Sequence, residues 1–156
     1  MTENMYQLES HSAQQTEQLA LALTALLQGG DVITLSGDLG AGKTTLTQGI
    51  GKGLGVKRHV NSPTFTLVKE YQGETYDLYH MDMYRIEDEL EEFGLEEYIH
   101  SGNGIVVIEW PQKIAAQLPA ERLHIEIKKS GEDSRVLQVT PYGDRYHNIA
   151  EEWVKV

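Results

Sequence analysis

Apolar residues recur at helical spacing near the start of the chain and form short continuous runs further on. Between Ser12, whose hydroxyl suits a helix N-cap, and Gly29, which suits a helix end, four leucines share one helical face. They are Leu19, Leu23, Leu26 and Leu27. The mainly apolar runs at 32–36 and 105–109 do not alternate, which is typical of strands buried on both faces. A helix predicted at 44–54 follows the first of these strands.

Alternating apolar and polar residues predict two β-hairpins. The strands 65–71 and 75–82 are joined by the tripeptide Gln-Gly-Glu, and the strands 123–128 and 135–140 flank the turn Ser-Gly-Glu-Asp. Because the strands of a hairpin run antiparallel, these two units should add antiparallel pairs to a sheet whose other strands are connected through helices.

Three more helices are expected in the second half of the chain. A short acidic helix is predicted at 87–93, and 95–100 could form another. Tyr146, Ile149 and Trp153 lie on one face of a C-terminal helix. The chain therefore alternates strands with helices.

The turn between the strand 32–36 and the helix 44–54 carries the most specific signal. Residues 37–44 read GDLGAGKT, a full match to the phosphate-binding pattern GxxxxGK[ST] in the strand-to-helix context that the pattern requires. Gly37, Gly40 and Gly42 allow positive φ and bring backbone amides close to an anionic phosphate. We therefore predict a phosphate-binding loop (P-loop).

Side chains after the glycines complete this predicted nucleotide site. Lys43 can reach the β- and γ-phosphates, Thr44 can ligate the Mg²⁺ that bridges them, and Thr45 can reach the α-phosphate. The start of the helix adds unpaired amides and the positive end of its dipole. The predicted nucleotide-binding residues are Asp38, Leu39, Gly40, Ala41, Gly42, Lys43, Thr44 and Thr45.

Two acidic residues end predicted strands where ligands bind in open α/β sheets. Glu109 follows the buried run 105–108 and is our first choice for the Mg²⁺ side of the site. Asp82 ends an alternating strand, and we assign it water positioning or metal support. The predicted catalytic residues are Lys43, Asp82 and Glu109, the predicted metal ligands are Thr44, Glu109 and Asp82, and which acid activates water stays open.

Several weaker signals accompany the loop. Thr64 and Thr66 could sense the γ-phosphate or simply begin a strand. The six histidines are scattered, and we expect each to be satisfied by neighbours or exposed rather than to ligate a metal. Trp110 and Trp153 are interpreted as core or pocket-wall aromatics. Adenine contacts carry no motif, although residues near Ser12 and Ser134 are candidates.

Composition narrows the class of protein. The 156 residues suit one domain, 1–156, and the absence of cysteine fits a reducing compartment, so we expect a cytoplasmic protein. The polar, acidic N-terminus resembles no export signal, and no apolar run is long enough for a membrane. The net charge of −11 argues against a large direct nucleic-acid interface.

Four motifs in order resemble one family. GDLGAGKTT at 37–45, SPTF at 62–65, DMYR at 82–85 and EWP at 109–111 closely resemble the TsaE (YjeE) family of bacterial ATPases. The fold class we expect is α/β: a P-loop NTPase-like three-layer sandwich with a mixed, mostly parallel central sheet and antiparallel hairpin additions.

The resemblance implies a function that the P-loop alone does not. It implies an ATPase that uses ATP and Mg²⁺ and is required for threonylcarbamoyl modification of the adenosine beside the tRNA anticodon. It implies the partners TsaD and TsaB, with tRNA reached only indirectly through that complex. Two alternatives stay open on the residues themselves: a small-molecule kinase, and a nucleotide-gated binding module with negligible turnover.

Overall fold

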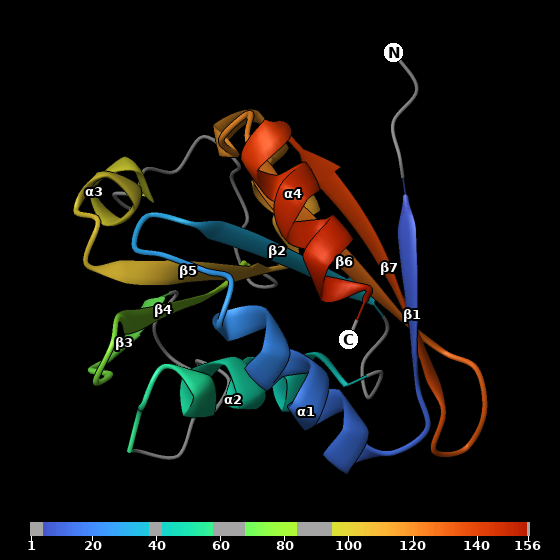
Figure 1. The fold of residues 1–156 in the computed structure, drawn as a ribbon. Coiled ribbons are helices and arrows are strands. Elements are labelled where there is room, and N and C mark those ends of the chain that lie inside the picture. The colour runs from blue at the N-terminus through green and yellow to red at the C-terminus, as the bar shows by residue number, and fades with distance from the viewer. Residues whose placement is uncertain (1–4, 38–41, 58–67, 84–94, 156) are drawn as a thin grey trace.

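A seven-stranded mixed sheet forms the centre of the protein, in the order β1-β7-β6-β2-β5-β4-β3 (Figure 1). The computed structural model describes residues 5–37, 42–57, 68–83 and 95–155. The strands are β1 (Tyr6–Ser10), β2 (Val32–Gly37), β3 (Val68–Tyr71), β4 (Asp77–Asp82), β5 (Gly104–Glu109), β6 (Arg122–Lys129) and β7 (Arg135–Tyr142).

The four inner strands β6, β2, β5 and β4 run parallel to one another, and the outer pairs are antiparallel. The β3–β4 and β6–β7 hairpins supply two of the antiparallel pairs, and the pairing of β1 with β7 supplies the third. The mixed sheet with a parallel centre and antiparallel additions is therefore confirmed.

Helices cover both faces of the sheet, which gives three layers. On one face, α1 (Ala13–Thr24), α2 (Lys43–Gly53) and α4 (Asp144–Trp153) pack over a large core that includes Leu35 and Val107. On the other, α3 (Leu95–His100) and the 3₁₀ helix η1 (Pro111–Gln117) pack over a smaller core. In Figure 1, α1 and α2 lie side by side, and α4 crosses in front of β6 and β7.

Local chemistry explains why the first helix starts and how it docks. The Ser12 hydroxyl accepts a hydrogen bond from the amide of Gln15 (3.0 Å), which confirms Ser12 as the predicted N-cap, and the Gln15 side chain accepts one from the amide of His11 (2.8 Å). Trp153 is fully buried on α4, and its indole N–H donates to the carbonyl of Leu19 on α1 (2.9 Å). The last helix is thereby fixed to the first.

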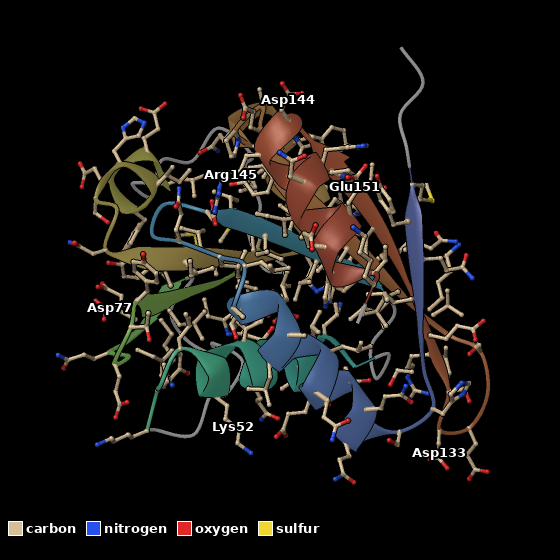
Figure 2. All side chains as sticks on the ribbon, viewed as in Figure 1. Lys52, Asp77, Asp133, Asp144, Arg145 and Glu151 are labelled. Carbon is tan, nitrogen blue, oxygen red and sulfur yellow. The ribbon has the colours of Figure 1, made fainter. Side chains whose placement is uncertain are left out.

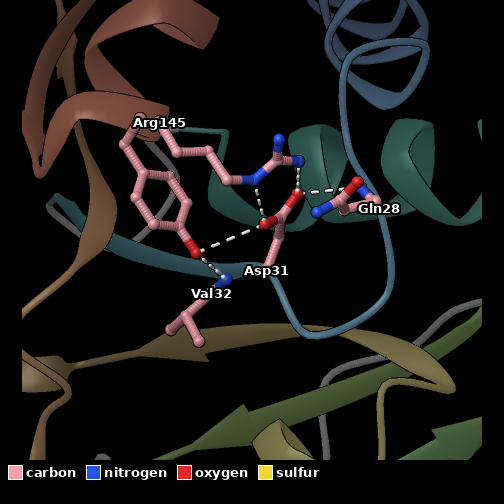
Figure 3. A network of polar contacts seen from close by, with 5 residues as sticks. Gln28, Asp31, Val32 and Arg145 are labelled. Atoms are coloured by element: carbon pink, nitrogen blue, oxygen red, sulfur yellow. Dashed lines mark hydrogen bonds and ion pairs between the residues drawn. The ribbon is translucent and has the colours of Figure 1, made fainter.

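A polar network fixes the start of β2 to α4 (Figure 3). Asp31, buried immediately before β2, accepts hydrogen bonds from Nε (2.8 Å) and Nη2 (2.6 Å) of Arg145 and from the amide of Gln28 (2.7 Å). The Tyr146 hydroxyl accepts a hydrogen bond from the amide of Val32 (2.9 Å). The α1–β2 turn, the first strand of the parallel core and the last helix therefore meet at one buried carboxylate.

Two elements differ from the sequence prediction. The N-terminal segment forms β1, which we did not predict because its polar residues alternate over only five positions and its partner is β7. A 3₁₀ helix follows Pro111, where we expected only the end of a strand. The predicted helix at 87–93, the start of the strand 65–71 and both threonines, Thr64 and Thr66, lie outside the described residues.

The surface is rich in charge. Figure 2 shows charged side chains such as Lys52 on α2, Asp133 in the β6–β7 turn and Glu151 on α4 at the periphery. Among the residues that the structure describes, no helix has the length and apolar character needed to span a bilayer.

Candidate nucleotide-binding site

The helix α2 begins at the C-terminal edge of the parallel strands, directly after the predicted P-loop. Its N-cap, Gly42, has a left-handed backbone (φ 111°, ψ 14°) and no side chain to cap the first amides. A Cβ added at Gly42 would meet no atom of the described residues within 4 Å. The glycine is therefore required by its backbone conformation, and the space beside it is open, as a phosphate would need.

Gly37, at the other end of the loop, is constrained by packing as well. It ends β2 with a φ of +145°, and a Cβ there would lie 2.5 Å from the carbonyl oxygen of Ile127 on β6. Asp38, Leu39, Gly40 and Ala41 lie outside the described residues. Both described glycines of the motif thus have the positive φ that the sequence predicted.

Lys43 is held in place between the loop and β5. The side chain is 5% exposed; its Nζ donates to the carbonyl oxygen of Gly37 (2.8 Å) and lies 4.3 Å from the centre of the Trp110 ring. Trp110 has a left-handed backbone (φ 58°), the only residue other than glycine with positive φ in the described ranges. Such strain is concentrated at functional sites, and here it places an aromatic face against a cation.

The predicted acids lie on two adjacent parallel strands: Glu109 ends β5, which pairs with β2, and Asp82 ends β4, the next strand beyond β5. Asp82 and Glu109 are register partners at the ends of the parallel strands β4 and β5. Their side chains share the face that α2 covers, because side chains alternate along a strand and Leu78 and Val107 belong to the core under that helix. Asp82 is half-buried and Glu109 is 3% exposed.

Glu109 has a partner that the sequence did not reveal. Nε2 of His80, on β4, lies 2.5 Å from Oε2 of Glu109, and the imidazole is fully buried. The contact satisfies one ring nitrogen of His80, so the expectation that a neighbour satisfies this histidine holds for Nε2 only. Its link to Glu109 was missed because the two residues lie 29 positions apart in the sequence, on different strands. The register of β4 with β5 and the alternation of side chains along each strand place both side chains on the same face of the sheet.

The threonines after Lys43 lie at the open end of α2. Thr44 is exposed and Thr45 is half-buried. Within the described ranges, no group of three or more His, Asp or Glu side chains could hold a metal ion by itself. A Mg²⁺ ion at this site would therefore need other ligands as well. The sequence prediction names two such ligands, the hydroxyl of Thr44 and the phosphate oxygens of the nucleotide.

A cavity that includes a histidine lies beside the site. A cavity of about 520 Å³ on the other face of the sheet shares Gly37 and Trp110 with the site and includes His124. His124 is hydrogen-bonded to Thr34 (2.8 Å) and Ser36 (3.1 Å), and burial, followed by the charge of Arg122, lowers its pKa.

The two segments that the sequence offered as candidates for adenine contacts lie next to each other. His11 Nδ1 lies 3.3 Å from the hydroxyl of Ser134, so the start of α1 and the β6–β7 turn, both candidates from the sequence, are neighbours.

Comparison with known proteins gives a consistent result. The family model described as "Threonylcarbamoyl adenosine biosynthesis protein TsaE" matches residues 10–137. The chain belongs to the TsaE family. It is 52% identical over 139 residues to the tRNA threonylcarbamoyladenosine biosynthesis protein TsaE of Bacillus subtilis, covering 89% of this chain and 87% of that protein. The TsaE of a Nostoc species is 43% identical over 131 residues, which cover 81% of this chain and 80% of that one.

A solved structure confirms the fold of this TsaE family member. The crystal structure of Bacillus subtilis YdiB superimposes with a TM-score of 0.83 and 39% identity, covering 99% of this chain and 97% of that one. The resemblance inferred from four short motifs is therefore confirmed across most of the chain, and so is the α/β, P-loop NTPase-like fold.

Proposed function

We propose that this chain binds and hydrolyses ATP in the biosynthesis of threonylcarbamoyladenosine in tRNA. The observation that carries the proposal is the start of α2, where an uncapped helix N-terminus, a left-handed glycine with open space beside it and a buried lysine converge. These are the elements by which a P-loop holds phosphates. Membership of the TsaE family supports the pathway.

Each residue has a role in this proposal. Lys43 leaves or shares its contacts with Gly37 and Trp110 and neutralises charge on the phosphate oxygens. Thr44 and Glu109 lie on the Mg²⁺ side, and Asp82 orients water or supports the metal. The chemistry that a bound Mg²⁺ would supply here is neutralisation of the charge on the phosphate oxygens.

The proposed partners follow from the family resemblance and fit the charge of the chain. A net charge of −11 is unfavourable for direct contact with tRNA phosphates. A role exerted through TsaD and TsaB fits this charge, because the chain then needs little basic surface of its own. ATP binding and hydrolysis would change how the chain engages that complex, and the chain would act in the cytoplasm.

Phosphate release measured with and without TsaB–TsaD tests the proposal. We expect slow release alone and faster release with the complex, with a loss of about 100-fold or more in Lys43→Ala. We expect Asp82→Asn to keep nucleotide affinity while hydrolysis falls, and Glu109→Gln also to weaken the dependence on Mg²⁺. Near-normal hydrolysis by Lys43→Ala would refute the assignment, and transfer of labelled phosphate to a metabolite would favour a kinase.

A further inference from the structure

The fully buried imidazole of His80 has no role in the function proposed so far. It lies on β4, two residues before Asp82, and faces the same core as Leu78 because side chains alternate along the strand. Its register partner on β5 is Val107, two residues before Glu109. His80 therefore lies two residues further from the C-terminal edge of the sheet than Asp82, and its side chain contacts Glu109 from the interior of the sheet.

The contact between His80 and Glu109 connects two groups that are costly to bury alone. The side chains are 0% and 4% exposed, and Nε2 and Oε2 are 2.5 Å apart. A buried carboxylate needs hydrogen-bond donors in place of water, and in the described part of the chain this imidazole supplies the one side-chain donor to Glu109. The bond therefore sets where the carboxylate group can lie.

The second ring nitrogen shows how the proton is arranged. His80 Nδ1 is buried and has no hydrogen-bond partner among the residues that the structure describes. A proton on Nδ1 would be a buried donor without an acceptor, whereas a proton on Nε2 is used in the bond to Glu109. The geometry thus assigns the tautomer in which Nε2–H donates, and Oε2 of Glu109 accepts.

We propose that His80 is a positioning residue for Glu109, a role that rests on the proposed Mg²⁺–ATP site. By holding Oε2, the imidazole fixes the orientation of the carboxylate and leaves Oε1, which accepts no side-chain hydrogen bond from the described residues, available to a ligand. A histidine that orients a carboxylate in this way acts through it and touches neither nucleotide nor metal.

Two substitutions of His80 distinguish positioning from packing. In His80→Gln the amide nitrogen can occupy the place of Nε2 and still donate to Glu109. In His80→Asn, the matched control, the amide reaches only the place of Nδ1, although the polarity is the same. We expect His80→Asn to lower kcat by about 10-fold or more and to raise the Mg²⁺ concentration for half-maximal rate, with KM for ATP within about threefold. His80→Gln should restore both values to within about threefold of wild type.

A readout without turnover separates this inference from the proposed function. Binding of Mn²⁺ with ADP, followed by electron paramagnetic resonance, should weaken by about 10-fold in His80→Asn and not in His80→Gln, even if the wild-type chain hydrolyses no ATP. Thermal unfolding shows which variants are folded. If His80→Asn binds Mn²⁺–ADP as wild type does, or if the folded Gln variant is as impaired as the Asn variant, His80 serves packing alone and the inference is wrong. Absence of Mn²⁺–ADP binding by the wild type would instead refute the nucleotide site.

Discussion

Replacing Arg145 with methionine tests how far the buried carboxylate of Asp31 stabilises the fold. Methionine keeps much of the length and the apolar stem but removes both hydrogen bonds, at 2.8 and 2.6 Å. The Asp31 side chain is 5% exposed, and the amide of Gln28 would be its main remaining donor, since the Tyr146 hydroxyl is 3.5 Å away. The variant therefore leaves a buried charge with too few partners.

The size of the loss lies between two known limits. Removing one partner of a fully buried ion pair costs about 3–5 kcal/mol, whereas an exposed pair contributes roughly 0–1 kcal/mol. The Arg145 side chain is 38% exposed, so water can enter its place and hydrate Asp31 in part. We expect the free energy of unfolding to fall by about 2 kcal/mol and Tm by roughly 4–8 °C for a domain of this size.

Urea unfolding followed by circular dichroism measures the effect, with Lys52→Met as the matched control. Lys52 also pairs with a carboxylate, that of Glu17 at 2.8 Å, but the two side chains are 67% and 39% exposed. We expect the control to lose about 0.5 kcal/mol or less. The reasoning would be refuted if Arg145→Met lost no more than the control. Nucleotide affinity of the folded variant should be unchanged, because the network lies at the N-terminal end of β2 and the loop follows its C-terminal end.

Three further predictions concern the site and the pH dependence of stability. Gly42→Ala should lower the free energy of unfolding by about 1–2 kcal/mol, because φ is +111° but no atom of the described residues lies within 4 Å of the added Cβ. It should also abolish nucleotide binding in calorimetry, and retained affinity would contradict the assigned site. Burial lowers the pKa of His124 below its ordinary value of 6.5. As the pH falls below 6.5, the unfolded state therefore binds a proton at His124 before the folded state does, and the free energy of unfolding should decrease. His124→Gln should flatten this decline in urea midpoints, and an unchanged slope would assign it to other groups. Burial raises the pKa of Tyr146 to about 12, so stability should fall between about pH 10 and 12 by at most about 1.4 kcal/mol per pH unit; a Tyr146→Phe variant with the same alkaline slope would contradict this.

Strong local signals predicted most of the architecture. The P-loop pattern located β2 and α2, alternation located both hairpins, and a continuous apolar run located the buried strand β5, because these patterns act over a few residues. β1 has a weaker signal: its five residues are stabilised by pairing with Leu137 and its neighbours, which are more than a hundred residues away in the chain.

The residues proposed for the site could be chosen one at a time from the sequence, but their contacts could not. Lys43, Asp82 and Glu109 could be chosen from motif and strand position. The stacking of Lys43 on Trp110 depends on a left-handed backbone at a tryptophan, which no propensity would assign there. The bond from His80 to Glu109 depends on the parallel register of β4 with β5, which is a property of the assembled sheet.

The same register of β4 with β5 determines how His80, Glu109 and Asp82 are arranged from the interior of the sheet to its C-terminal edge. His80 lies behind Glu109, and Glu109 lies level with Asp82, at the ends of strands that flank β2 on one side. Lys43 lies at the start of α2, and its ammonium contacts the residue that follows Glu109. Trp110 directly follows Glu109 in the chain. A movement of the Lys43 ammonium toward a phosphate and a movement of the Glu109 carboxylate toward a metal would therefore both affect the backbone of these two residues. The strained backbone of Trp110 therefore lies where the two halves of the site are joined, and a substitution there should affect Lys43 and Glu109 together.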